Sequence, residues 1–357
     1  MDNDKICIAY FRKISGVIYP QDYATGDGSI SNLWGNACIE KAYVSCPTGG
    51  TIYLRAGYYK LAGQLTVSKK VNVIGEGINK VFIITTTSSG IYLDVNSAYS
   101  TLKNITIDGD AQSLSDTGSS CIVVKYANHL LMENIKVKNA GTSGMSLIGS
   151  YNTYNNIWAV DCYSHGIHPG GSTASANSYN LYKNIYITGT KTSNAFDDNG
   201  NDDSSYNTYS YIVCWENAAK GIAIHGQVGG ELTNSKSYDN TSSYGIDISH
   251  SVDFLITDCL AYGNKGCGIY LNDNENTNLS NTISKNNTGS GIYIEDCPYT
   301  KLSLCQSYDD RDTPTQEYGI RLYGTVGSID IINCKLSPNK IGEIYNPNGV
   351  EIVIINN

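Results

Sequence analysis

The chain has 357 residues, a net charge of −9 and only four arginines, so it has no basic stripe that could hold nucleic acid. No apolar run reaches the roughly 18 residues of a membrane-spanning helix. The segment Met1–Lys13 is too polar for a secretory signal peptide. Composition thus favours an ordinary globular class and leaves the oligomeric state open.

The N-terminal part predicts a cap. Apolar residues with helical spacing run from Asn32 to Val44, and Gly49-Gly50 ends them. The next segment, Thr51-Ile52-Tyr53-Leu54, alternates as a strand. A helix followed by short strands suits the end of a solenoid, because an open end would leave strand edges and core exposed.

From Gly90 onward a short repeat dominates: a small residue, an apolar one, a variable one and a second apolar one. Ten copies recur, most often 22–24 residues apart, and begin at Gly90, Cys121, Gly144, Gly166, Ala195, Gly221, Gly245, Gly268, Gly291 and Gly319. Each period also holds a further strand, often opened by Asn. Such stacked short strands predict an all-β fold, a right-handed parallel β-helix with an N-terminal helical cap.

We expect a single β-helix domain over residues 1–357. Its parts are an N-terminal cap with the first turns (1–89), regular turns (90–336) and C-terminal closing turns (337–357). The recurrent Asn residues are interpreted as a structural ladder of stacked amides. Cys259, Cys305 and Cys334 replace apolar residues of the repeat, which predicts buried free thiols, while Cys38 and Cys46 could pair or stay free.

Strand alternation converts the repeat into a surface map. The second and fourth residues of each copy point inward, and the third and fifth point outward. Only two successive copies break the apolar fourth position, with Pro169 and Asp198, and they lie in the one dense cluster of His and Asp. A repeat that breaks its own pattern twice in succession is where we expect function.

The same register predicts which side chains meet. It places His168 beside Asp197 on adjacent turns and Asn199 beside His225 one column over, with Asp247 two turns beyond Asp197. The extra residues of the two longest inner spacings, near 171–177 and 201–207, are expected to project as loops beside this patch.

These positions give the candidate site. The candidate catalytic residues are His168, Asp197, Asp198 and His225, and the candidate substrate-binding residues are His165, Asn199, Asp247, Tyr270, Tyr293 and Lys220. An inward carboxylate is costly, so we expect either a strand kink at Asp198 or a partner for it. The adjoining acidic run offers Asp202 and Asp203 to a metal, with calcium as the candidate cofactor, although the run lacks the Glu that closes a calcium-binding loop.

The chain resembles the pectate-lyase-like right-handed parallel β-helix superfamily. The entry segment, from Gly26-Asp27-Gly28 to Gly75-Glu76-Gly77, is similar to that of phage tailspikes and polysaccharide lyases. The central turns resemble the catalytic module of mannuronan carbon-five epimerases, which carries a Tyr-Gly-Phe-Asp-Pro-His stretch. Here His165-Gly166-Ile167-His168-Pro169-Gly170 matches it at Pro169, with His165, His168 and Gly170 in place of Tyr, Asp and His. The later His of that family corresponds to His225.

Three functions follow as hypotheses. The first is a lyase or epimerase acting on a uronic-acid-containing polysaccharide, in which His168 removes a proton, Asp197 orients it and His225 carries the second proton. Lys125, Lys191 and Lys220 are candidates for holding the polyanion. The second is a tailspike-type glycoside hydrolase with paired Asp residues. The third is a non-catalytic glycan-binding or structural solenoid. All three suggest an extracellular, cell-surface or virion-associated protein.

Overall fold

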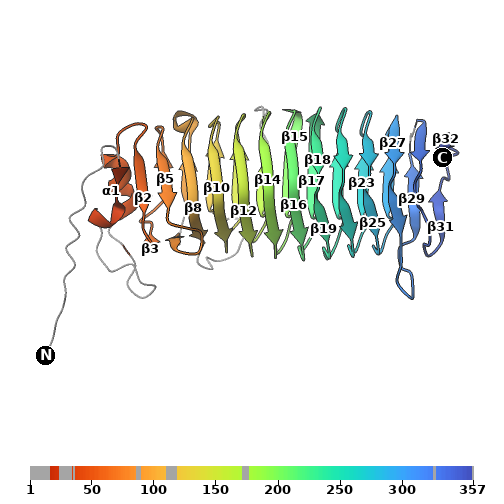
Figure 1. Ribbon diagram of the computed structural model, residues 1–357, viewed down its shortest axis with the longest axis horizontal. Coiled ribbons are helices and arrows are strands. Elements are labelled where there is room, and N and C mark those ends of the chain that lie inside the picture. Colours follow the sequence, from red (N-terminus) through yellow and green to blue (C-terminus); the bar gives the residue numbers. More distant parts are fainter. Residues whose placement is uncertain are drawn as a thin grey trace.

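The computed structural model describes residues 17–23, 34, 37–85, 90–109, 119–170, 177–324 and 327–355, with the backbone alone for residues 200–203. The chain winds into a parallel β-helix, an elongated stack of coils that advances from one end to the other (Figure 1). Strands of successive coils pair in parallel and in register. The β-helix predicted from the repeat is confirmed.

One wall of the coil, sheet B, carries the repeat. Its 12 strands are β4 (Leu65–Val67), β7 (Ile91–Leu93), β9 (Ile122–Lys125), β11 (Met145–Ile148), β13 (Ile167–Pro169), β15 (Phe196–Ser205), β17 (Ile222–Val228), β20 (Ile246–Ser249), β23 (Ile269–Asn272), β26 (Ile292–Glu295), β29 (Tyr318–Tyr323) and β31 (Gly342–Tyr345). The sheet therefore extends one coil beyond the ten recognised copies at each end. The copies in β4 and β31 lack the small first residue, which is why the sequence pattern missed them.

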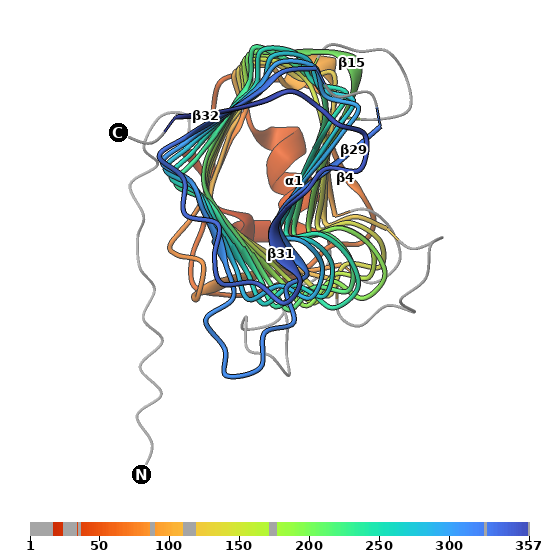
Figure 2. The ribbon, with the colours of Figure 1, turned by 90° about the vertical axis from the view of Figure 1, so that its right-hand side faces the viewer.

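The remaining walls form sheet A. Its strands are β1 (Val17–Ile18), β2 (Thr51–Leu54), β3 (Gly57–Lys60), β5 (Asn72–Gly75), β6 (Val81–Ile84), β8 (Thr101–Asp108), β10 (Leu131–Lys138), β12 (Thr153–Val160), β14 (Leu181–Thr188), β16 (Thr208–Trp215), β18 (Glu231–Thr233), β19 (Lys236–Tyr238), β21 (Leu255–Thr257), β22 (Leu260–Tyr262), β24 (Asn278–Ser280), β25 (Ile283–Lys285), β27 (Thr300–Ser303), β28 (Gln306–Tyr308), β30 (Ile329–Ile332) and β32 (Ile352–Ile355). Figure 2 looks along the coil and shows β32 across from β4 and β29 of sheet B.

A helix covers the N-terminal end of the coil, as predicted. Helix α1 (Cys38–Ser45) lies within the outline of the coils in Figure 2 and buries Cys38, Ile39 and Ala42. It begins later than the predicted Asn32, because Trp34 instead pairs its backbone with Tyr59 in β3. The two further helices of the described chain are short 3-10 turns, η1 (Pro20–Tyr23) and η2 (Val95–Ser97), and none is long and apolar enough to cross a bilayer.

The recurrent Asn residues turn the corner within sheet A. Asn104, Asn134 and Asn156 have left-handed φ angles of 59°, 54° and 54°, a conformation that Asn tolerates better than most residues. The Asn134 amide donates to Asn104 at 2.9 Å, and Asn156 donates to Asn134 at 2.7 Å. These contacts confirm the structural amide ladder.

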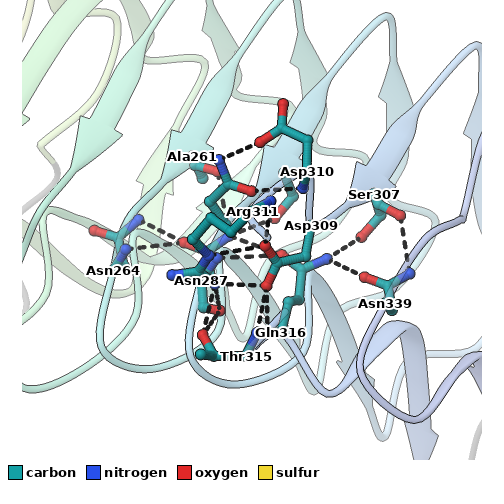
Figure 3. Close-up of polar contacts among 12 residues, drawn as sticks. Ala261, Asn264, Asn287, Ser307, Asp309, Asp310, Arg311, Thr315, Gln316 and Asn339 are labelled. Carbon is teal, nitrogen blue, oxygen red and sulfur yellow. Dashed lines mark hydrogen bonds and ion pairs between the residues drawn. The ribbon is translucent and has the colours of Figure 1, made fainter. Parts of the chain in front are cut away.

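A second amide ladder lies inside the coil, at the corner before sheet B. The Asn240 side chain donates to Asn264 at 2.9 Å, and Asn264 donates to Asn287 at 3.1 Å. Each side-chain oxygen also accepts a backbone N–H of the preceding coil, so the corner leaves few buried polar groups unpaired. Figure 3 shows Asn264 and Asn287 in this ladder and its continuation through Gln316 to Asn339.

The long insertion between β28 and β29 is fixed to the end of that inner ladder. This loop extends beyond the outline of the coils (Figure 1). The buried Asp309 carboxylate accepts hydrogen bonds from Arg311 at 2.6 Å and from the backbone N–H groups of Thr315 and Gln316 at 2.6 and 2.8 Å (Figure 3). These bonds hold the pKa of Asp309 well below its usual range despite burial, which acts in the opposite direction.

Candidate functional site

The outward column of sheet B is the one that the repeat predicts. Strands β13 and β15 pair Ile167 with Phe196, so the residues that follow, His168 and Asp197, lie side by side on adjacent coils. The His168 Nδ1 lies 3.3 Å from the Asp197 Oδ2 and 3.0 Å from the Asp197 carbonyl oxygen. The column continues in register as Ala223, Asp247, Tyr270, Tyr293 and Arg321. The predicted His168–Asp197 contact is confirmed.

A second histidine completes the group. His165 precedes β13, and its Nε2 lies 3.1 Å from the same Asp197 Oδ2. Its ring stacks on that of His168, with centroids 4.6 Å apart. The side chains of His165 and His168 are 18% and 23% exposed, so solvent can reach both rings. We call His165, His168 and Asp197 the His–Asp cluster.

Residues of the corner before sheet B position this cluster. Asn194 donates from its amide to the Asp197 Oδ1 at 2.8 Å and accepts the Lys220 backbone N–H at 3.2 Å. The Ser193 hydroxyl lies 2.8 Å from the His165 Nε2. Ser164 and Ser143 lie 3.1 and 3.4 Å from the His165 Nδ1. These corner residues belong to no recognised copy of the repeat, so the sequence pattern did not find them.

Within the cluster, the contacts between His168 and Asp197 favour the charged form of each side chain. Burial would lower the pKa of His168, but hydrogen bonding and the charge of Asp197 raise it above its ordinary value. Burial would raise the pKa of Asp197, yet hydrogen bonds from His165, His168 and Asn194 hold it far below the usual range. Asp197 is therefore an anion that holds the Nδ1 edge of His168. Within the described part of the chain, no hydrogen bond reaches the His168 Nε2.

Asp198 points the other way, into the core, as the alternation predicts. Its side chain is 0% exposed and accepts a hydrogen bond from the Tyr209 hydroxyl. Burial raises the pKa of Asp198 to about 7, although the Tyr209 bond opposes the shift. Of the two expected alternatives, a kink or a partner, the structure has the partner. Asp197 and Asp198 thus face opposite sides of β15 and cannot reach one ligand together.

Lys220 and Asp247 form a second polar group on the outer face of sheet B. The Lys220 ammonium pairs with the Asp247 carboxylate, which is 1% exposed and also accepts from Ser249 at 2.6 Å. Burial lowers the pKa of His225; Asp247 opposes this effect and Lys220 adds to it, leaving the imidazole below its ordinary value. His225 aligns with Asn199 and Ser249 in the ladder, so the predicted Asn199–His225 neighbours are confirmed.

An aromatic row continues the column toward the C-terminus. The rings of Tyr270 and Tyr293 lie 5.1 Å apart, and the Tyr270 hydroxyl donates to Glu295 at 2.5 Å. The Tyr244 ring lies 4.3 Å from that of Tyr270, and the Arg321 guanidinium lies 4.9 Å from the Tyr293 ring. Tyr244 was missed because it stands directly before the repeat copy at Gly245.

Four other expectations have different outcomes. The side chains of Asp202 and Asp203, and residues 171–176 of the first expected loop, lie outside the described residues. The expected loop at 201–207 is wrong, because β15 continues to Ser205. The pairing with β17 shifts between Asn199 and Ser204 and then resumes, so the strand absorbs the extra residues as an irregularity. Lys191 pairs with Asp161 at 2.6 Å rather than with a residue of the cluster.

Comparisons with known proteins agree with this architecture. A family profile described as a right-handed β-helix region matches residues 201–357, and this match identifies the coil as right-handed. Mannuronan C5-epimerases AlgE2 and AlgE5 of Azotobacter vinelandii are each 25% identical over 69% and 70% of this chain. The match spans only 21% and 22% of those proteins.

Solved structures show the same fold. The A-module of mannuronan C-5 epimerase AlgE4 from Azotobacter vinelandii superposes with a TM-score of 0.66 at 15% identity, covering 94% of this chain and 99% of the module. The Dettilon tailspike protein gives a TM-score of 0.70 at 14% identity, covering 92% of this chain and 68% of that one. The catalytic domain of a GH87 alpha-1,3-glucanase gives 0.62 at 16% identity, covering 89% and 67%.

Proposed function

We propose that this chain acts on an acidic polysaccharide by removing the proton next to a uronate carboxylate, the first step shared by lyases and epimerases. The observation that carries the proposal is the His168–Asp197 pair on the outer face of sheet B. A carboxylate that holds one imidazole nitrogen fixes the ring orientation and tautomer, and leaves the other nitrogen available to exchange a proton. In this chain that second nitrogen is the His168 Nε2.

The neighbouring residues supply the other requirements of this chemistry. His225 lies on the next coil after Asp197, and its lowered pKa makes it a neutral second proton carrier. Lys220 is a cation of this face near His225, placed to attract a uronate carboxylate and the enolate-like anion formed after proton removal. Asp247 is buried beneath Lys220, so we assign it to positioning Lys220.

The polymer is expected to run along the coil axis. Coils stack about 4.8 Å apart, so the outward column offers contacts to successive sugars. The Tyr270 and Tyr293 rings continue this column and provide apolar surfaces, while Arg321 adds a positive charge. The mannuronan C5-epimerase names of the relatives make mannuronan the first substrate to test, and an extracellular or virion location would match such a substrate.

A hydrolase is the second candidate. Asp197 and Asp247 share one outward column two coils apart, about 9.6 Å, near the upper end of the separation used by inverting glycosidases. The GH87 alpha-1,3-glucanase is a structural neighbour in keeping with that chemistry. The burial of Asp247 under Lys220 favours the first proposal.

A panel of polysaccharides, with and without uronic acids, separates these functions. Lyase action produces both ultraviolet absorbance from unsaturated uronates and new reducing ends, whereas a hydrolase produces only reducing ends. An epimerase produces neither, but changes the proton NMR spectrum of mannuronan. Loss of proton abstraction in His168→Ala, with activity kept in His250→Ala, supports the proposal. Activity confined to neutral glycans, or absence of any reaction, contradicts it.

A further inference from the structure

The His–Asp cluster has a second property that its acid–base role does not require. Within the described residues, His165, His168 and Asp197 are the set of three side chains whose ligand atoms all lie within 4.8 Å of one another. Their atoms are two imidazole nitrogens and one carboxylate oxygen, from adjacent coils of a rigid sheet. We propose that the His165 Nε2, the His168 Nδ1 and the Asp197 Oδ2 form a binding site for a divalent cation of the Zn²⁺ type.

Two of the three distances between these atoms match a tetrahedral ion, and the third, between the His165 Nε2 and the His168 Nδ1, is within 4.8 Å. Zinc bonds to nitrogen and carboxylate oxygen are about 2.0–2.1 Å long, so two ligands of a tetrahedron lie about 3.3 Å apart. The Asp197 Oδ2 lies 3.1 Å from the His165 Nε2 and 3.3 Å from the His168 Nδ1. An ion can therefore replace the shared protons with little movement of the backbone.

The ligand types select the class of ion. Two imidazoles with one carboxylate suit zinc and its neighbours, whereas calcium prefers oxygen ligands alone. The Asn194 amide donates a hydrogen bond to the Asp197 Oδ1 at 2.8 Å, so Oδ2 is the carboxylate oxygen left to coordinate the ion. Ser164, 3.1 Å from the His165 Nδ1, orients that ring from behind, as partners of metal-binding histidines do. Three protein ligands leave the fourth position of the tetrahedron open.

Two contacts compete with the ion. The Ser193 hydroxyl lies 2.8 Å from the His165 Nε2, and the Asp197 carbonyl oxygen lies 3.0 Å from the His168 Nδ1. Binding must displace both, so removal of the Ser193 hydroxyl should not weaken it. The cation site does not depend on the proposed function. A chain that holds the ion cannot at the same time use His168 as the proposed base, because the ion occupies the atoms that orient His168.

Calorimetric titration of the untagged chain with zinc chloride, without any polysaccharide, tests the site. We expect one ion per chain, and absorption bands of tetrahedral geometry when Co²⁺ replaces Zn²⁺. His165→Ala, His168→Ala and Asp197→Asn should each weaken binding more than about tenfold. Ser193→Ala should keep or tighten the affinity. His250→Ala should leave the affinity unchanged, because the exposed His250 lies outside the His–Asp cluster and, among the described residues, forms an ion pair with Asp273 at 3.6 Å.

Several results would overturn the proposal. These are no saturable binding to the wild-type chain, unchanged affinity in His165→Ala, equal loss in His250→Ala, or displacement of Zn²⁺ by millimolar calcium. Circular dichroism melts show which variants remain folded, and any one folded ligand variant decides the question. Because no substrate is present, failure of the metal site and failure of the proposed function are separate outcomes.

Discussion

Steric crowding explains why the first residue of each repeat copy is small, and a substitution at Gly291 measures the cost of a larger side chain. A Cβ added there would overlap the Ser307 hydroxyl, and would lie 2.7 Å from the Gln316 Nε2 and 3.0 Å from the Gly319 carbonyl oxygen. Ser307 cannot move away freely, because its hydroxyl donates to that carbonyl at 2.6 Å. We expect Gly291→Ala to cost about 1–3 kcal/mol, the range for overpacking a filled interior.

A double-mutant cycle isolates this overlap. Ser307→Ala alone removes the bond to the Gly319 carbonyl and the bond from the Gln316 amide at 3.3 Å, and it should cost about 1–3 kcal/mol. The Ser307→Ala background removes the closest overlap and leaves the Gln316 amide and the Gly319 carbonyl as the remaining close contacts of the new methyl group, so the double variant should be more stable than the sum predicts by at least about 1 kcal/mol. Urea unfolding followed by circular dichroism measures each free energy.

Gly63→Ala is the matched control, because no atom lies within 4 Å of a Cβ at that position. It should change stability by less than about 0.5 kcal/mol. Additive effects of the Gly291 and Ser307 substitutions, within about 0.5 kcal/mol, would refute the steric explanation of the repeat.

Further predictions concern single side chains. Tyr209→Phe removes the donor to buried Asp198 and should cost about 1–3 kcal/mol of unfolding free energy, which urea unfolding measures. Asp309 has a depressed pKa, so its contribution to stability is present above the unfolded value of about 3.9 and is lost as the pH falls below it; Asp309→Asn should flatten the acid side of a plot of melting temperature against pH. His168→Ala removes one of several donors to the buried Asp197 carboxylate, so it should cost about 1–3 kcal/mol of unfolding free energy while abolishing glycan modification, and failure of the variant to fold would make His168 a structural bridge. Titration of the denatured chain should find the cysteines as free thiols, since those of the described residues form no disulfide.

The sequence alone was sufficient for the coil and for the register of its outer face. The successive repeat copies with strict alternation determine which residues stack, and the copies at Gly166 and Ala195 are enough to bring His168 next to Asp197. It also identified Asp198 as an inward carboxylate that needs a partner, although it could not name Tyr209, which comes from β16 in sheet A.

What the repeat could not predict lies at the corners between strands. Ser193 and Asn194 reach the site from corners whose length varies from coil to coil, so no fixed spacing assigns them a neighbour. Lys220 was a sequence candidate, but its pairing with Asp247 was not predicted. The same variation hid the burial of Asp247, which alternation places on an outward position but Lys220 covers. The register of the strands follows from the repeat pattern. Whether an outward residue is exposed or buried depends instead on long side chains from neighbouring coils, which can cover it.

Proton NMR of mannuronan incubated with the chain in D₂O tests the central claim most directly. Both lyase and epimerase chemistry remove the proton at carbon five, by elimination or by exchange with deuterium. We predict that this signal decays with the wild-type chain and with His250→Ala, but persists with His168→Ala. Decay at the wild-type rate in His168→Ala, or an unchanged carbon-five signal in the wild type while the polymer is cut, would contradict proton abstraction by the His168–Asp197 pair.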